Sequence, residues 1–131
     1  MANRHTIQRD IVLSAVNALR NHPTAEEIYD HIHSAHPTVS RATVYRNLAY
    51  LSETGAVLHV ELPNTADIYD FNTIPHYHIR CVECGRVYDI EYPYIADIEK
   101  KVSDESGFTV LTHELIFTGL CPLCHKEKNN N

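Results

Sequence analysis

Two copies of Cys-x-x-Cys contain all four cysteines of the 131-residue chain. The first pair is Cys81 and Cys84, and the second pair is Cys121 and Cys124. Each pair can bind one metal ion from a tight turn, and four thiolates complete a tetrahedron around Zn²⁺ that leaves no position open for chemistry. The cysteines therefore predict a structural zinc site that ties the middle of the chain to its C-terminal end.

The alternative for these cysteines is two disulfides or a thioredoxin-like redox pair. A signal peptide would favour disulfides, but none is evident, and neither pair opens a helix directly after a strand. No apolar run approaches the ~20 residues that are needed to cross a bilayer. We therefore favour zinc and expect a cytoplasmic protein.

The charge of the chain is unevenly distributed along the sequence. The formal net charge of −6 argues against a nucleic-acid partner, but residues 1–55 hold five Arg and five acidic residues and are neutral overall. Residues 56–131 hold six basic and twelve acidic residues. The N-terminal part can therefore approach phosphates while the acidic part is repelled, which would orient binding.

Three helices are predicted in the first 55 residues. Apolar residues at helical spacing from Ile7 to Leu19 predict the first, with Thr6 as its cap. Thr24 and Glu27 form a capping-box pattern that opens the second helix, and His36-Pro37 ends it.

The third helix is expected to begin after Ser40 and to end at Gly55. Apolar residues at helical spacing, from Val44 to Leu51, form the stripe of this helix that is expected to be buried. Three side chains on its polar side suit contacts with DNA: Arg41, Tyr45 and Arg46.

A strand pair is predicted next, at residues 57–62 and 68–71 around a turn at 63–67. Helices followed by such a hairpin are typical of a winged helix-turn-helix, whose third helix enters the major groove. There arginines pair with guanine, and Tyr45 packs on a thymine methyl or binds a phosphate; Arg4, just before the first helix, would reach phosphate or the minor groove. A dimer would double the few basic residues. A helical domain with a solvated polar face remains the alternative.

The composition changes from Pro75 onward and predicts a second unit. Strands are expected at 78–81, 86–90 and 108–117, and a helix at 94–105 that Gly107 ends. We expect three apolar side chains of this helix to point inward, and the tail 126–131 to be disordered. Those apolar residues are Ile95, Ile98 and Val102.

A second ligand set contains no thiolate. His76 and His78 are two residues apart on a predicted strand, which places both imidazoles on one face. Asp70 lies upstream and Asp89 lies on the next strand. Nitrogen and oxygen ligands of this kind suit Fe²⁺, Mn²⁺ or Zn²⁺.

These motifs together resemble those of the ferric uptake regulator superfamily. The resemblance is carried by residues 22–29 (HPTAEEIY), residues 42–48 (ATVYRNL), His76-Tyr77-His78 and both cysteine pairs. It implies an α+β fold, a homodimer and a metal-dependent repressor of a palindromic, AT-rich DNA operator. It also implies a winged-helix DNA-binding domain with a hinge at residues 1–72, followed by a dimerisation and metal-binding domain at 73–131 with the structural zinc.

The resemblance is greatest to the peroxide-responsive repressor branch. It implies a regulatory Fe²⁺ or Mn²⁺ at the hinge, and hydrogen peroxide as the signal, sensed by iron-catalysed oxidation of His22 and His76. Five ligands would leave a sixth position of an octahedral ion open to peroxide. Iron-sensing relatives usually carry Glu where Asp89 stands, and zinc-sensing relatives often use a further cysteine. The implied regulatory ligands are His22, Asp70, His76, His78 and Asp89.

Two other functions remain open from the sequence. One is a repressor that responds only to the level of iron, manganese or zinc. The other is an iron oxygenase or zinc hydrolase, but no general base or substrate pocket is evident and the helix-turn-helix would be unexplained. Because self-oxidation is stoichiometric, we expect no enzyme. Pro75 and Tyr77 occupy two ligand places of a third metal site of some relatives, so we expect that site to be absent and assign His113 no function.

Overall fold

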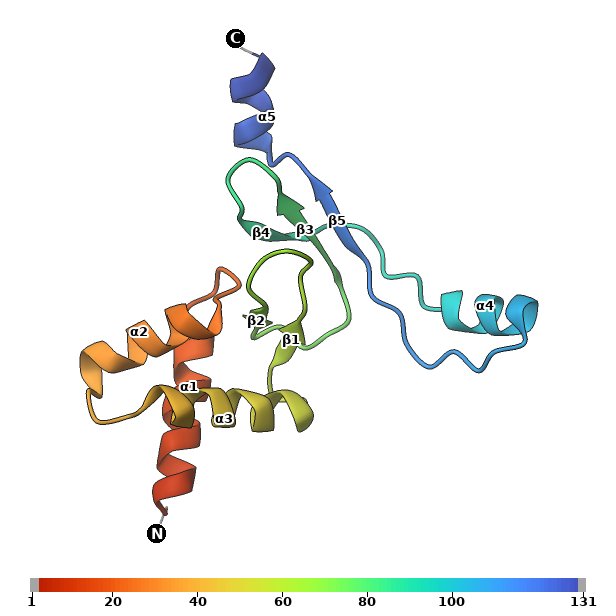
Figure 1. The fold of residues 1–131 in the computed structure, drawn as a ribbon. Helices are drawn as coiled ribbons and strands as arrows, with labels where there is room; N and C mark the ends of the chain where they lie inside the picture. Colours follow the sequence, from red (N-terminus) through yellow and green to blue (C-terminus); the bar gives the residue numbers. More distant parts are fainter. Residues whose placement is uncertain (1–2, 130–131) are drawn as a thin grey trace. The chain divides into compact units, whose positions relative to one another are not determined.

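The computed structural model describes residues 3–129 and divides the chain into two compact units, Met1–Ile74 and Pro75–Asn131 (Figure 1). Helices and small sheets occur together, which confirms the predicted α+β class. Within the described residues, no helix has both the length and the apolar character that a membrane span requires.

Three helices form most of the first unit: α1 (Arg4–Ala18), α2 (Ala25–Ala35) and α3 (Arg41–Glu53). The predicted cap of α1 is wrong, because Asn3 rather than Thr6 occupies the N-cap and its Oδ1 accepts the Thr6 backbone N–H at 2.8 Å. Arg4 consequently lies in the first turn of α1 and not before it. Asparagine caps helices as well as threonine does, and with Asn3 as the cap it is the backbone N–H of Thr6 itself that is satisfied.

The predicted caps of α2 and α3 are confirmed. Thr24 accepts the Glu27 backbone N–H at 3.2 Å, and the Glu27 carboxylate accepts the Thr24 backbone N–H at 3.1 Å. Ser40 accepts the Thr43 backbone N–H at 3.1 Å. Gly55 follows α3 with φ of +81°, the left-handed conformation that glycine adopts without strain.

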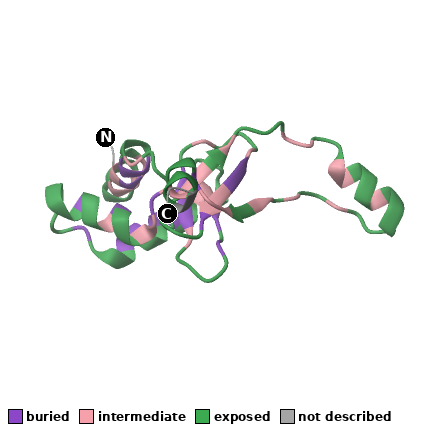
Figure 2. Ribbon diagram, turned by 90° about the horizontal axis from the view of Figure 1, so that it is seen from above, coloured by how far each residue is buried: buried purple, intermediate pink, exposed green. Residues whose placement is uncertain are grey.

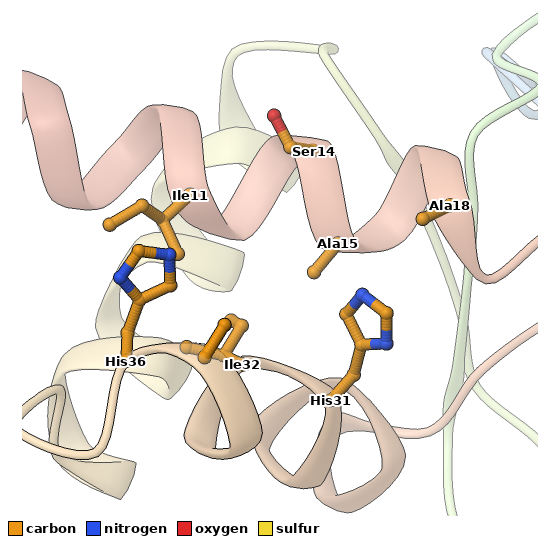
Figure 3. Close-up of a pocket in the computed structure, with 8 residues that line it drawn as sticks. Ile11, Ser14, Ala15, Ala18, His31, Ile32 and His36 are labelled. Atoms are coloured by element: carbon orange, nitrogen blue, oxygen red, sulfur yellow. The ribbon is translucent and has the colours of Figure 1, made fainter.

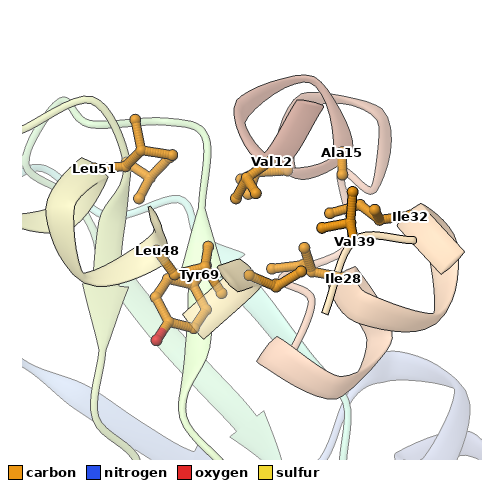
Figure 4. Packing of buried hydrophobic residues seen from close by; sticks show 11 residues of the cluster. Val12, Ala15, Ile28, Ile32, Val39, Leu48, Leu51 and Tyr69 are labelled. Carbon is orange, nitrogen blue, oxygen red and sulfur yellow. The ribbon is translucent and has the colours of Figure 1, made fainter. Parts of the chain in front are cut away.

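The helices pack around one apolar core, shown in Figure 4. Val44, Leu48 and Leu51 of α3 are buried, which confirms the predicted stripe. On α1 the buried side chains are Val12, Ala15 and Val16, whereas Ile7 is 51 % exposed. Burying a side chain of this size contributes roughly 1.5–3 kcal/mol, so this core is the main source of the unit's stability.

A hairpin completes the first unit. β1 (Leu58–Val60) and β2 (Ile68–Asp70) pair antiparallel, and Asn64 in the connecting turn has a φ of +62°. The strands are shorter than predicted. β2 is also joined to the residues before α2, because the Tyr69 backbone N–H donates to the Pro23 carbonyl at 2.8 Å. This bond fixes the last residues of β2 beside the turn that contains His22.

The second unit is built on a three-stranded sheet in the order β4-β3-β5. β3 (Tyr77–Cys81) pairs antiparallel with β4 (Val87–Ile90) and parallel with β5 (Ile116–Gly119). The predicted strand at 108–117 is wrong over most of its length, because β5 begins only at Ile116. Residues 108–115 have the composition of a strand but belong to no strand of the sheet, and composition alone does not make a strand.

The second unit also contains two helices, α4 (Ile98–Ser106) and α5 (Pro122–Asn129). Gly107 ends α4 as predicted, but α4 begins later than expected and contains no buried residue, so its predicted inward stripe is wrong (Figure 2). The predicted disorder of the tail is wrong for 126–129, which belong to α5; residues 130 and 131 lie outside the described chain. Pro122 favours this helix, since its fixed φ suits the first helical position.

Candidate metal sites and recognition surface

The four cysteines converge within the second unit. Cys81 ends β3, Cys84 lies in the turn to β4, and Cys121 and Cys124 are brought close by the parallel pairing of β5 with β3. All four Sγ atoms lie within 4.8 Å of one another, and those of Cys84 and Cys121 are 3.9 Å apart. Tetrahedral Zn–S bonds of about 2.3 Å require sulfurs about 3.8 Å apart. The four sulfurs therefore fit a zinc ion.

The electrostatics of this cluster also favour a cation. Backbone N–H groups, first that of Cys121, lower the pKa of Cys81 to about 6, while the neighbouring Cys121 sulfur raises the pKa of Cys124 to about 12. The four thiols are free and form no disulfide. Negative charges on thiolates this close repel one another, which disfavours ionisation, and a bound divalent cation offsets this repulsion. A cluster of four converging thiols is not the arrangement of two disulfides or of a redox pair.

Two of the predicted regulatory ligands meet within the first unit. His22 Nε2 lies 3.3 Å from Asp70 Oδ2. Asp70 ends β2, and its Oδ1 accepts the Asn72 backbone N–H at 2.9 Å, which fixes the carboxylate plane. His22 has a φ of +56°, which is uncommon for a residue other than glycine. A strained backbone that presents an imidazole to a buried carboxylate indicates a functional position.

The other three predicted ligands meet within the second unit. His76 Nε2 lies 2.9 Å and His78 Nε2 lies 3.4 Å from the same oxygen, Asp89 Oδ1. His78 and Asp89 are direct partners in the β3–β4 ladder, and the two imidazole rings are 4.5 Å apart. Two imidazoles and one carboxylate oxygen at this spacing fit a divalent ion that prefers nitrogen and oxygen ligands. Each unit thus carries part of the predicted set, and a single site made from both parts stays a prediction.

The predicted DNA-contact residues are exposed on the first unit. On α3, Arg41, Tyr45 and Arg46 all face solvent, and Arg4 is exposed in the first turn of α1. Arg41 and Tyr45 both bind Glu26, a residue that the sequence did not single out. Glu26 lies fifteen residues before Arg41, so no local spacing could indicate the contact.

Further groups escaped the sequence-based prediction. His59, Glu61 and Asp67 lie together on the hairpin, with His59 Nε2 2.9 Å from Asp67 Oδ2. In the second unit, His113 binds Glu99 through Nδ1 at 2.5 Å and Tyr77 through Nε2 at 2.7 Å. The hydrogen bond from His113 holds the pKa of Glu99 below its usual value.

A pocket of about 330 Å³ lies between α1 and α2 (Figure 3). Small side chains such as Ala15 and Ala18 leave this space, and His31 and His36 border it. Its lining contains no carboxylate and no thiol, so it lacks the mixed ligand set of the sites above.

Comparison with known proteins agrees with this arrangement. A family model described as the ferric uptake regulator family matches residues 1–118. The peroxide-responsive repressor of Staphylococcus epidermidis is 34 % identical over 126 residues, which cover 96 % of this chain and 84 % of that protein. The protein of the same name from Staphylococcus aureus is 36 % identical over 121 residues, 92 % of this chain and 82 % of that one.

Solved structures share the fold. The Campylobacter jejuni peroxide stress regulator is 28 % identical with a TM-score of 0.76, over 92 % of this chain and 91 % of that one. The Helicobacter pylori ferric uptake regulator, at 24 % identity, also has a TM-score of 0.76, over 95 % of this chain and 83 % of that one. The resemblance that the motifs indicate is therefore confirmed: the chain belongs to the ferric uptake regulator family, whose members are transcriptional regulators.

Proposed function

We propose that the chain is a metal-dependent, DNA-binding transcriptional repressor that senses hydrogen peroxide through iron-catalysed oxidation of His22 and His76. The observation that carries the proposal is that each unit brings together part of the predicted nitrogen and oxygen ligand set. His22 and Asp70 meet in the first unit, and His76 and His78 meet Asp89 in the second. The relatives named as peroxide-responsive repressors support the choice of signal.

Ligands from both units would make the metal a switch. One ion bound by both ligand groups would fix the angle between the unit that carries α3 and the second unit. If the ion binds most tightly at the angle that fits DNA, part of its binding free energy would raise the affinity for DNA. In a homodimer, this angle sets the distance between two recognition helices, which must match successive major grooves of a palindromic, AT-rich operator. The thiolate zinc has a separate role, since it holds the small sheet of the second unit together.

The imidazole and carboxylate ligands support the proposal of peroxide sensing, because ligands of this kind suit Fe²⁺. Bound Fe²⁺ supplies the one-electron chemistry that activates peroxide beside its ligands. One peroxide oxygen is inserted into an imidazole C–H of His22 or His76, and the other leaves as water. An oxidised imidazole would bind metal poorly, so the ion would no longer join the two ligand groups and DNA would be released. The protein is consumed as it reacts, which makes it a sensor and not an enzyme, and we propose that it acts in the cytoplasm.

Peptide mass spectrometry tests this proposal. The Fe²⁺-loaded protein is treated with peroxide and digested with trypsin, which releases residues 21–41 and 47–80 as single peptides. We expect an added oxygen that fragment spectra place on His22 or His76, while His31 and His59 in the same peptides stay unmodified. The Mn²⁺ form should show no such addition. Metal-dependent DNA binding without histidine oxidation would instead support a repressor that responds only to metal level.

A further inference from the structure

Glu26, in the first turn of α2, binds two side chains of α3 at once. Its carboxylate accepts hydrogen bonds from Arg41 Nε at 2.9 Å and Arg41 Nη2 at 3.1 Å, and from the Tyr45 hydroxyl at 2.9 Å. The Arg41 guanidinium also lies 4.5 Å from the centre of the Tyr29 ring. We call Glu26, Arg41 and Tyr45 the Glu26 clamp.

The geometry of the clamp restricts its members more than it stabilises the fold. Arg41 and Glu26 are 56 % and 53 % exposed, and exposed ion pairs contribute little to stability. A guanidinium that meets a carboxylate through two parallel hydrogen bonds is nevertheless fixed in orientation. Tyr45 is fixed by the same carboxylate. Both α3 side chains are therefore held in one arrangement before any ligand arrives.

The clamp also changes the charge that α3 presents. The hydrogen bonds from Tyr45 and Arg41 lower the pKa of Glu26, so this carboxylate is ionised at neutral pH and cancels the charge of Arg41. The other arginine of α3, Arg46, contacts the neutral Thr43 hydroxyl at 3.5 Å. Among the described ion pairs none involves Arg46, so Arg46 carries the uncompensated positive charge of α3.

The clamp faces open space on this side of the unit. Glu26 and Tyr45 line a hollow of about 260 Å³ together with residues at the start of β2, among them Asp67, which directly precedes that strand. Because Glu26 cancels the charge of Arg41 and Asp67 adds no positive charge, this surface offers little of the attraction to phosphates that all DNA sequences share. Base contacts then have to supply a larger share of the binding energy.

We propose that Glu26 is a positioning residue for DNA selectivity. It orients Tyr45 and cancels the charge of Arg41, which lowers affinity for phosphates of any sequence and leaves recognition to Tyr45 and Arg46. This inference rests on the proposed function, because it requires that α3 meets DNA.

The test compares full-length wild type with Glu26→Gln, both loaded with Zn²⁺ and Mn²⁺. The DNA probes are duplexes that the wild type selects from a random pool, and the same duplexes with shuffled sequence. Affinity is measured over a series of salt concentrations. Without Glu26, each Arg41 should be free to bind a phosphate. Each such contact should make the slope of log affinity against log salt concentration more negative by about 0.9 and raise affinity for shuffled DNA about eightfold at 0.1 M salt. The selected duplexes should gain less, so that selectivity falls.

Two controls isolate the mechanism. Glu27→Gln removes the same charge one residue away and keeps the capping interaction with Thr24, since glutamine serves in a capping box as glutamate does. It should leave selectivity and salt dependence unchanged. In an Arg41→Ala background, Glu26→Gln should lose its effect on the salt dependence. An equal effect of Glu27→Gln, or a persistent effect without Arg41, would overturn the proposal.

A measurement without DNA checks the clamp itself. Its hydrogen bond to Glu26 raises the pKa of Tyr45, so Glu26→Gln should lower that pKa in a spectrophotometric titration, with Tyr45→Phe identifying the signal. An unchanged Tyr45 titration contradicts the clamp. Selectivity that is equal in wild type and Glu26→Gln overturns this inference alone, whereas a Mn²⁺-loaded wild type that binds no duplex overturns the proposed function and this inference with it.

Discussion

One carboxylate oxygen of Asp89 contacts both histidines of the predicted ligand set in the second unit. His76 and His78 approach Oδ1 at 2.9 and 3.4 Å, and the ladder pairing of His78 with Asp89 fixes the distance between the strands that carry them. Because strand pairing fixes the backbone of Asp89, its carboxylate can move only through rotation of a short side chain. The length of the side chain at position 89 therefore controls where a carboxylate oxygen can coordinate a metal that is bound by the two imidazoles.

Lengthening this side chain gives a prediction at the residue scale. Asp89→Glu moves the carboxylate outward by one C–C bond, about 1.5 Å, which alters the ligand geometry but keeps its charge. We expect Mn²⁺-dependent DNA binding to persist, while peroxide oxidation of His76 in the Fe²⁺ form becomes at least about tenfold slower, because a displacement of about 1 Å is enough to cost that much in a reaction that requires alignment. Peptide mass spectrometry over time measures this.

The matched control is Asp104→Glu on α4. Asp104 is exposed and pairs with Lys100 at 2.7 Å, far in the sequence from every predicted ligand. This variant should oxidise at the wild-type rate. Equal oxidation rates in Asp89→Glu and wild type would show that the carboxylate length does not matter.

At the scale of single elements, the start of α1 shows how similar signals compete. Asn3 and Thr6 are both good caps, and their spacing lets Asn3 accept both the Thr6 N–H at 2.8 Å and the Thr6 hydroxyl at 3.0 Å. The helix therefore begins one turn earlier than Thr6 alone would indicate. Caps without such a competitor, at Thr24 and Ser40, were predicted correctly from local sequence.

This difference can be measured by urea denaturation. Asn3→Ala should lower the free energy of unfolding by about 1 kcal/mol, as is typical for loss of an N-cap. Thr6→Ala should cost less, because it removes a hydroxyl hydrogen bond and leaves the cap in place. A larger loss for Thr6→Ala would place the start of the helix at Thr6.

At the scale of the whole molecule, the two units are stabilised by different means. The first has an apolar core that three helices and β2 share. In the second, the buried hydrophobic side chains are Tyr77, Cys81 and Cys121, and α4 buries none of its residues. Cores this small are stabilised by crosslinks or by oligomerisation, and the four thiols are placed to bind a crosslinking zinc ion.

Removal of zinc should therefore affect the units unequally. After treatment with a strong chelator, amides of β3, β4 and β5 should lose protection in hydrogen exchange mass spectrometry, while amides of α1, α2 and α3 keep it. Added Zn²⁺ should restore protection, and added Mn²⁺ should not. Equal loss of protection in both units, or none in the second, would contradict this account of stability.

The sequence alone determined what depends on local spacing. The cysteine pairs, the capping box at Thr24 and the apolar stripe of α3 each lie within one or two turns of chain, so their chemistry could be identified without coordinates. The alternation of His76 and His78 on one strand is of the same kind. These features were sufficient to predict the α+β class and the family.

Only the tertiary structure decided what depends on residues far apart in the chain. The contact of Glu26 with Arg41 and Tyr45, the bond between His113 and Glu99, and the late start of β5 all follow from which elements pack together. A strand needs a partner and a carboxylate needs a cation, and neither partner is specified by its neighbours in sequence. The packing of α2 against α3 and the pairing of β5 with β3 bring such residues together, and both depend on segments that are far apart in the sequence.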